Sequence, residues 1–160
     1  MEVISVKHKA DIIKGEYQFA DKVKSEVLSL LRTCNTIPQN SSNVKVSIHT
    51  EWNWKLNNIT LKNLREFIRE EIEKYYTPGC KCGGKRYYLQ TTNFWGNVYE
   101  KGDHAQSHSH KPNDFSFAYF VKAKWYDSPL IFTDSGKRIR PKEGTFAAFP
   151  SYLMHHVPKH

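Results

Sequence analysis

Two histidines in the second half of the chain have the spacing of metal ligands. His108 and His110 are separated by one residue, and on a strand residues two apart point to the same side. A third candidate, His155, follows the apolar run 146–149. Two imidazoles from one strand and a third from a distant strand form a facial site with positions left open for substrate and oxygen. Neutral imidazole binds Fe(II), Zn, Ni or Cu, so the pattern predicts a metal site without choosing the metal.

The cysteines give a weaker signal. Cys80 and Cys82 are flanked by glycines and could supply half of a metal site, but Cys34 alone is not a matching second pair. The favoured interpretation is a glycine-rich turn that carries reduced thiols. No Ser/His/Asp pattern, P-loop or dinucleotide-binding glycine motif is present, so the histidines carry the main prediction.

The first half of the chain has the periodicity of helices. Apolar residues recur at helical spacing over 16–34, in a stripe from Phe19 to Leu31, and over 60–76, in a stripe from Leu61 to Tyr75. The polar stretch 35–43 separates these two segments. Thr60 or Asn58 can cap the second helix, and Pro78-Gly79 is expected to end it. The stretch 44–48 alternates like a short strand.

The second half changes to short segments with the pattern of strands. They are bounded by glycine, proline and asparagine turns, as in a sandwich or barrel. Helices followed by strands predict an α+β fold: a double-stranded β-helix, or jelly roll, with N-terminal supporting helices. We expect one domain over 1–160, with helical support from 1–78 and the jelly-roll core at 86–160. The strand candidates are 86–99, 115–123, 130–132, 145–149 and the region of Val157.

Composition limits the class of protein. A chain of 160 residues with 39% hydrophobic content is long enough for one packed domain. No stretch reaches the roughly 18 consecutive apolar residues of a membrane span, and the N-terminus lacks a secretory core, so a cytoplasmic protein is expected. The net charge of +8 comes from 24 basic and 16 acidic residues dispersed along the chain. Dispersed charge does not favour a dedicated nucleic-acid interface.

Two segments resemble the iron site of 2-oxoglutarate/Fe(II)-dependent oxygenases. In the prolyl 4-hydroxylase-like branch a Tyr and a Gly precede the His-x-Asp ligand pair, as Tyr99 and Gly102 precede His108-Ser109-His110 here. The segment 141–157 matches a proline–glycine turn, an apolar strand and the distal iron histidine. The combination of Trp95-Gly96-Asn97, His-x-His and Phe-Pro-Ser-x-Leu-x-His resembles a group of such oxygenases common in bacteria and marine phages. The resemblance covers 94–157, and over 16–76 only the helical layout agrees.

The resemblance assigns roles to individual residues. His108 matches the first iron ligand and His155 the distal one, while His110 stands where most of the superfamily has Asp or Glu. Three imidazoles neutralise none of the iron charge, which a carboxylate would partly do. As an alternative, Asp114 or a water completes the site and His110 points away. Strand parity favours His110 as the ligand. His156 is expected in a structural or exposed position, and His104 is expected to be exposed, with a position behind the metal ligands as the alternative.

The resemblance also implies Fe(II) and 2-oxoglutarate as cofactors. Asn97 and Tyr99 resemble an Asn-x-Tyr pair that contacts 2-oxoglutarate in the related dealkylases, and Tyr119 is a further candidate. In the family an Arg or Lys beyond the distal histidine holds the far carboxylate of 2-oxoglutarate. The chain ends at His160, so we expect the last jelly-roll strand and this anchor to be missing from the sequence.

The implied activity is hydroxylation with O2 of a peptidyl substrate, prolyl being one option, or of a small molecule. If the gene is phage-borne, the protein would act in the host cytoplasm. Two other interpretations remain open. One is a cupin-like three-histidine dioxygenase that does not use 2-oxoglutarate, and the other is a jelly-roll binding module without catalysis.

Overall fold

The computed structural model describes residues 10–38, 42–76, 81–82, 85–86 and 88–159. The expected helix stop at Pro78-Gly79, Cys80 and the side chain of Cys82 lie outside this description. The elements, in chain order, are β1 (Ile13–Glu16), α1 (Ala20–Leu31), β2 (Val44–Lys45), β3 (Ile48–His49), α2 (Ile59–Tyr76), β4 (Lys81–Cys82), β5 (Lys85–Arg86), β6 (Asn97–Val98), β7 (His104–His108), β8 (Phe115–Tyr119), β9 (Leu130–Phe132), β10 (Arg138–Ile139), β11 (Thr145–Pro150) and β12 (His155–Val157).

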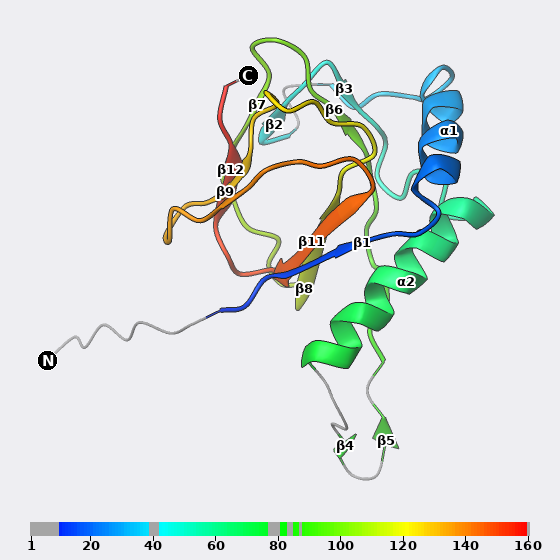
Figure 1. Ribbon diagram of the computed structural model, residues 1–160, viewed down its shortest axis with the longest axis vertical. Coiled ribbons are helices and arrows are strands. Elements are labelled where there is room, and N and C mark those ends of the chain that lie inside the picture. Colours follow the sequence, from blue (N-terminus) through cyan, green and yellow to red (C-terminus); the bar gives the residue numbers. More distant parts are fainter. Residues whose placement is uncertain (1–9, 39–41, 77–80, 83–84, 87, 160) are drawn as a thin grey trace, which may run out of the picture.

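Two antiparallel sheets form the centre of the described structure. One has the strand order β1-β11-β8 and the other β10-β9-β12-β7-β2, while β3–β6 and β4–β5 are separate pairs. The helices lie on the outer side of the three-stranded sheet, and the five-stranded sheet lies on its inner side (Figure 1). This arrangement of antiparallel sheets and two helices agrees with the expected α+β fold with supporting helices, and the jelly-roll topology stays a prediction.

The central strand β11 is apolar because both of its faces are covered. Phe146 and Ala148 point toward the helices, and Ala147 and Phe149 point toward the five-stranded sheet. None of these four side chains is more than 2% exposed. A strand buried on both faces becomes a continuous apolar run, which is how 146–149 appears in the sequence.

The helix α2 confirms the predicted helical pattern at 60–76. Of the two cap candidates it uses Asn58, whose side-chain oxygen accepts a hydrogen bond from the Leu61 N–H at 3.1 Å. The predicted apolar stripe is buried except for Tyr75, which is 54% exposed in the last turn of the helix. The buried members of the stripe are Leu61, Leu64, Ile68 and Ile72.

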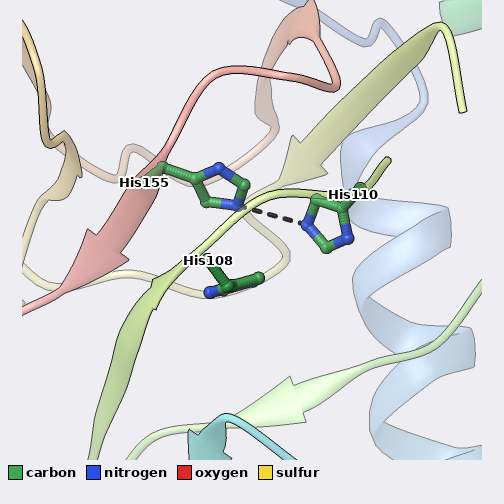
Figure 2. Close-up of side chains that lie close together, drawn as sticks. All are labelled: His108, His110 and His155. Carbon is green, nitrogen blue, oxygen red and sulfur yellow. Dashed lines mark hydrogen bonds between the residues drawn. The ribbon is translucent and has the colours of Figure 1, made fainter. Parts of the chain in front are cut away.

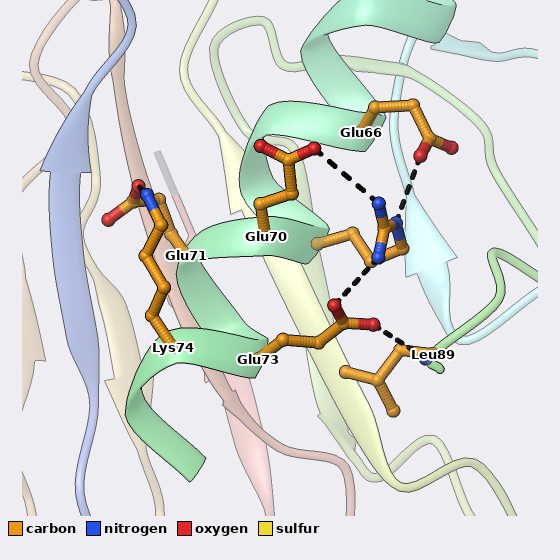
Figure 3. A network of polar contacts seen from close by, with 7 residues as sticks. Glu66, Glu70, Glu71, Glu73, Lys74 and Leu89 are labelled. Atoms are coloured by element: carbon orange, nitrogen blue, oxygen red, sulfur yellow. Dashed lines mark hydrogen bonds and ion pairs between the residues drawn. The ribbon is translucent and has the colours of Figure 1, made fainter. Parts of the chain in front are cut away.

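An ion-pair network on α2 holds the segment that follows it. Arg69 contacts Glu66 at 2.9 Å and Glu73 at 2.8 Å, with Glu70 at 3.6 Å (Figure 3). Glu73 also accepts a hydrogen bond from the Leu89 N–H at 2.8 Å. Partly exposed ion pairs add little stability by themselves. Their structural effect here is to hold the chain at Leu89 against the helix.

The predicted helix over 16–34 is wrong at its N-terminal end. Residues Ile13–Glu16 form β1, which pairs with β11, and the helix begins only at Ala20. A Cβ on Gly15 would lie 2.5 Å from the Phe146 ring, so glycine allows the two strands to approach. Phe19, predicted in the buried stripe, precedes the helix and is 54% exposed.

Two predicted strands are also corrected. The stretch 44–48 is divided into β2 and β3, which belong to different sheets. Of the predicted strand 86–99, residues 88–96 are irregular and only β6 follows them. Their backbone bonds with the turn after β3 instead of with a sheet: Thr50 N–H to Gly96 O and Trp54 N–H to Phe94 O, at 3.0 and 2.9 Å. Within the described residues no helix is long and apolar enough to cross a membrane.

Replacing Gly144 by alanine is expected to lower the free energy of unfolding by about 2–4 kcal/mol. Its φ is +78°, and an added Cβ would lie 2.8 Å from the Cβ of Ala20 at the start of α1. Gly136 is the matched control, because its φ of +66° is similar but no atom lies within 4 Å of the added Cβ. Gly136→Ala should cost only about 1 kcal/mol. If both variants lowered the free energy of urea unfolding equally, the close contact with Ala20 would not contribute, and the prediction would be wrong.

Candidate metal centre

The three histidines singled out by their spacing lie together at one end of the five-stranded sheet. Their ring centroids are 4.5 Å apart for His108 and His155, 4.9 Å for His108 and His110, and 5.0 Å for His110 and His155. One nitrogen of each lies within 4.8 Å of the others. The rings converge on one point from two strand ends and the intervening loop (Figure 2). This is the arrangement of a candidate metal centre.

Strand pairing explains why distant residues meet here. His108 is the last residue of β7 and His155 the first of β12, and the two are direct partners in the antiparallel ladder. His110 lies beyond the end of β7, where its N–H donates to the Ser151 carbonyl at 2.9 Å. Strand parity, the predicted reason for its orientation, is therefore wrong, although its ring does face the cluster. The loop bond to Ser151 holds the backbone of His110 beside the cluster.

Backbone carbonyls hold two of the rings. The Nδ1–H of His108 donates to the Gln106 carbonyl at 2.7 Å, and the Nδ1–H of His155 donates to the Leu153 carbonyl at 2.8 Å. A proton on Nδ1 leaves the Nε2 lone pair of each neutral imidazole available. Metal-binding histidines are oriented by hydrogen bonds of this kind.

Burial keeps His110 and His155 uncharged near neutral pH. Loss of solvent, reinforced by the neighbouring imidazoles, lowers the pKa of His110 to about 4. Burial and His108 lower the pKa of His155 to about 4 as well, against the opposing effect of its bond to Leu153. The rings of Phe132 and Phe149 lie 6.2 and 5.0 Å from that of His155 and supply its apolar surroundings. Near neutral pH these imidazoles are in the form that binds metals.

The metal-free protein is expected to lose stability as the pH falls from 6.5 to about 4. His110 and His155 take up protons in the unfolded chain below their ordinary pKa of 6.5, but in the folded chain only near 4. Unfolding therefore binds protons in this window, and the free energy of unfolding decreases as the pH is lowered. Urea unfolding at several pH values measures the slope. A His110→Gln variant should show a shallower slope, and an unchanged slope would contradict the assignment.

The donor set fits a first-row transition metal. His110 Nε2 and His155 Nε2 are 3.2 Å apart, close to the separation of about 3 Å for two nitrogens that bind one ion from about 2.1 Å. If both Nε2 atoms carry lone pairs, a proton or a metal ion shared between them removes the repulsion. Imidazole suits Fe, Zn, Cu and Ni alike. Among the described residues the cluster holds no carboxylate, so the alternative in which Asp114 replaces His110 is not supported.

The three residues predicted to contact 2-oxoglutarate, Asn97, Tyr99 and Tyr119, do not lie together as the three histidines do. Tyr119 packs in the helix-facing core near Tyr17, where burial raises its pKa to about 12, so the structure does not bring it to the histidines. Tyr99 packs against a small apolar cluster of Val44, Val46 and Ala105, and burial raises the pKa of its hydroxyl. Asn97 is the direct partner of His49 in the β3–β6 pair. Its side-chain oxygen is buried and has no partner among the described residues.

His104 and His156 lie outside the cluster, as expected from their positions. His156 Nδ1 is 3.1 Å from the Thr133 hydroxyl. Both histidines line a depression over β7 and β12 that does not include the three clustered histidines. His104 is half-buried instead of exposed, and its Nδ1 is buried without a partner in the described chain. His156 is therefore a natural control for His155 in ligand experiments.

A groove of about 440 Å³ opens beside the cluster and contains residues that the sequence analysis did not identify. His49, Trp52 and Trp95 line it, although Trp95 was noted as part of the Trp-x-Asn motif. The sequence gives no spacing that joins positions 49 and 52 to position 108. Their only signal is two tryptophans and a histidine of unassigned role. The lining residues are Ser42, Asn43, Val44, Lys45, His49, Trp52, Trp95, Gln106, His108, Ser109 and His110.

The helix α2 positions the aromatic wall of the groove, which Trp52 and Trp95 form. Arg65, only 6% exposed, donates to the Leu56 carbonyl at 2.7 Å and stacks over the Phe94 ring at 5.0 Å. It thus connects the turn that carries Trp52 with the segment that carries Trp95. The two segments are also bonded to each other through Thr50, whose hydroxyl accepts from the Gly96 N–H at 2.9 Å. The groove wall is therefore built on the core.

Comparison with known proteins gives a likeness in fold. No protein-family profile and no curated protein matches the sequence. The structure is similar to the crystal structure of a Pseudomonas putida prolyl-4-hydroxylase, with a TM-score of 0.60 and 14% sequence identity. The match covers 92% of this chain and 84% of that chain. At this identity the likeness establishes a prolyl-4-hydroxylase-like fold, here with a three-histidine cluster.

Proposed function

We propose that this protein is an Fe(II)- and 2-oxoglutarate-dependent oxygenase that hydroxylates a peptidyl or small-molecule substrate. The convergence of His108, His110 and His155 at the end of a sheet, beside a groove, is the observation that carries the proposal. The likeness in fold to a prolyl-4-hydroxylase supports it. Membership of the bacterial and marine-phage group within the prolyl 4-hydroxylase-like branch is part of this proposal and rests on the sequence motifs.

Each residue of the cluster has a defined task in this proposal. His108, His110 and His155 hold the ion, and the carbonyls of Gln106 and Leu153 fix two of the rings. Three neutral imidazoles leave the ion its full charge, which favours a chelating anion such as 2-oxoglutarate. Bound iron and 2-oxoglutarate supply the oxidation of substrate by O2. The protein binds and orients the reactants and keeps the ion in apolar surroundings.

Asn97 and Tyr99 remain the proposed contacts to 2-oxoglutarate. The co-substrate presents only acceptor oxygens, so Asn97 would serve it through its amide N–H2 and Tyr99 through its hydroxyl. The geometry favours Asn97 of the two, because its strand partner His49 lines the groove beside the cluster. Tyr119 is not retained in this role, since its ring packs in the helix-facing core.

Anaerobic titration of the Fe(II)-loaded protein with 2-oxoglutarate tests the proposal. A weak visible charge-transfer band should develop with the native protein and be absent from His108→Ala. Exposure to O2 should then convert 2-oxoglutarate into succinate. Iron binding without the band would overturn the assignment of the co-substrate, and failure to bind iron at all would overturn the catalytic proposal.

A second candidate function is supported by one observation. The described cluster holds three histidines and no carboxylate, which is also the donor set of a cupin-like dioxygenase that acts without 2-oxoglutarate. Succinate formation separates the two, because only the first consumes 2-oxoglutarate. The non-catalytic binding module is less favoured, since a structural zinc site is closed by four ligands, whereas three ligands beside a groove leave positions open.

A further inference from the structure

We infer that the groove beside the histidine cluster is a ligand site and that His49 is its positioning residue. The ligand is a neutral group with an apolar ring and an N–H donor, of the kind found in a cyclic amide. The ring packs against Trp52 and Trp95, and the donor bonds to Nε2 of His49. This inference deepens the proposed function by assigning the substrate side of the same centre, and it rests on that proposal for its catalytic meaning.

His49 is a buried acceptor without a donor. The residue is 3% exposed, and its Nδ1 lies 2.7 Å from the Thr50 carbonyl oxygen, to which only an N–H can bond. In the neutral imidazole the proton is therefore on Nδ1, and Nε2 carries a lone pair. Nε2 has no partner among the described residues, although His49 lines the groove. A buried polar atom left unsatisfied costs about 1–3 kcal/mol, so a ligand that brings a donor is favoured here.

A second acceptor lies on the same face. Asn97 is the direct cross-strand partner of His49, and paired residues project from the same side of a ladder. The Asn97 side-chain oxygen is also buried without a partner among the described residues. Two neighbouring acceptors that both lack donors favour a ligand that donates, while the amide N–H2 of Asn97 can still donate to an oxygen of 2-oxoglutarate.

Aromatic rings form a continuous path from His49 to the candidate metal centre. The His49 and Trp95 rings are nearly parallel, at 9° and a centroid distance of 6.3 Å, and Trp95 lies 5.6 Å from His110. Trp52 stands across both, 5.1 Å from His49 and 4.6 Å from Trp95. Trp52 is 50% exposed and lines the groove together with His49. A ring held on this wall would lie next to the histidine cluster.

Charge narrows the class of ligand. Aromatic walls can also bind cations such as methylated ammonium groups, usually with help from a nearby carboxylate. The described residues that line this groove include Lys45 and no Asp or Glu, and the whole chain carries a net charge of +8. A cationic ligand would be repelled, so the walls are assigned to the face of a neutral ring.

A matched pair of ligands tests the role of His49. Pyrrolidin-2-one has the ring and the N–H, while N-methylpyrrolidin-2-one has the ring alone. Binding to the full chain is followed by NMR shifts of the Trp52 and Trp95 indole N–H groups, with and without Zn(II). The lactam is expected to bind about tenfold more tightly, the ratio that one net hydrogen bond provides. Equal affinities, or no binding of the lactam, would overturn the inference.

Two variants of His49 distinguish the acceptor from the ring. His49→Phe keeps an aromatic face against Trp95 but removes the acceptor, and should reduce the tenfold preference to less than about twofold. His49→Gln keeps an acceptor near the Nε2 position and should restore part of the preference. A preference that persists in a folded His49→Phe would contradict the assignment. If that variant does not fold, the ligand pair on the native protein and on His49→Gln still decides it.

The failures of the two proposals are distinguishable. If the tenfold ligand preference is found but no charge-transfer band forms with Fe(II) and 2-oxoglutarate, the groove is a binding site and the oxygenase proposal fails. If the band forms and the preference is absent, the oxygenase proposal stands and His49 has no positioning role.

Discussion

Replacement of His108 by alanine is expected to weaken divalent-metal binding by at least about 100-fold. Removal of a residue that only supports a metal ligand typically costs 10–100-fold, and loss of a ligand should cost more. His108 is half-exposed at the end of β7, so the substitution leaves the buried core intact. His156→Ala is the matched control, because it removes an imidazole on β12 beside His155 but outside the cluster. That variant should bind within about twofold of the native affinity.

Calorimetric titration with Zn(II) or Co(II) under anaerobic conditions measures these affinities. The variant His110→Asp provides a further comparison, because it places a carboxylate where the chain has an imidazole. It should still bind the ion, since a carboxylate oxygen at that position is also a good ligand and lowers the charge of the site. Equal losses in His108→Ala and His156→Ala would show that the three-histidine cluster is not the metal centre.

The histidine cluster could be predicted from sequence because its spacing is local. His108 and His110 are separated by one residue, and the motif around His155 is contiguous, so no knowledge of distant contacts was needed to select them. The reason given for His110 was wrong, because β7 ends at His108 and a loop bond to Ser151 places the ring. The end of a strand depends on its ladder partners, which local alternation does not reveal.

His49 and Trp52 of the groove could not be predicted, because their link to the cluster depends on contacts between distant segments. His49 reaches the cluster through the β3–β6 pair and through its contact with Trp95, both of which join segments far apart in sequence. The helix α2, in contrast, repeats one apolar face over several turns and was predicted almost to its ends. The strand β1 has only four residues, one of them Gly15, and depends on its pairing with β11. Such an element has no strong local signal.

Replacing Phe149 by alanine is expected to damage both the core and the metal centre. Its side chain is 2% exposed between the two sheets, and its ring lies 4.9 Å from Phe132 and 5.0 Å from His155. Removal of a buried phenylalanine ring lowers the free energy of unfolding by about 3–5 kcal/mol. The cavity also removes a wall against which the His155 ring is packed, so metal affinity should fall by about tenfold or more.

Phe146→Ala separates these two effects. Phe146 lies on the same strand, is equally buried and packs against Phe67 of α2 at 6.0 Å, on the opposite face from His155. It should cost a similar 3–5 kcal/mol in urea unfolding. Its metal affinity, measured at a temperature at which all variants are folded, should stay near the native value. If both variants lost metal affinity equally, the loss would come from the lower stability of the whole core and not from the contact with His155. If only Phe149→Ala does, the core residue behind His155 sets the geometry of the site, because β11 presents one face to the helices and the other to the histidines.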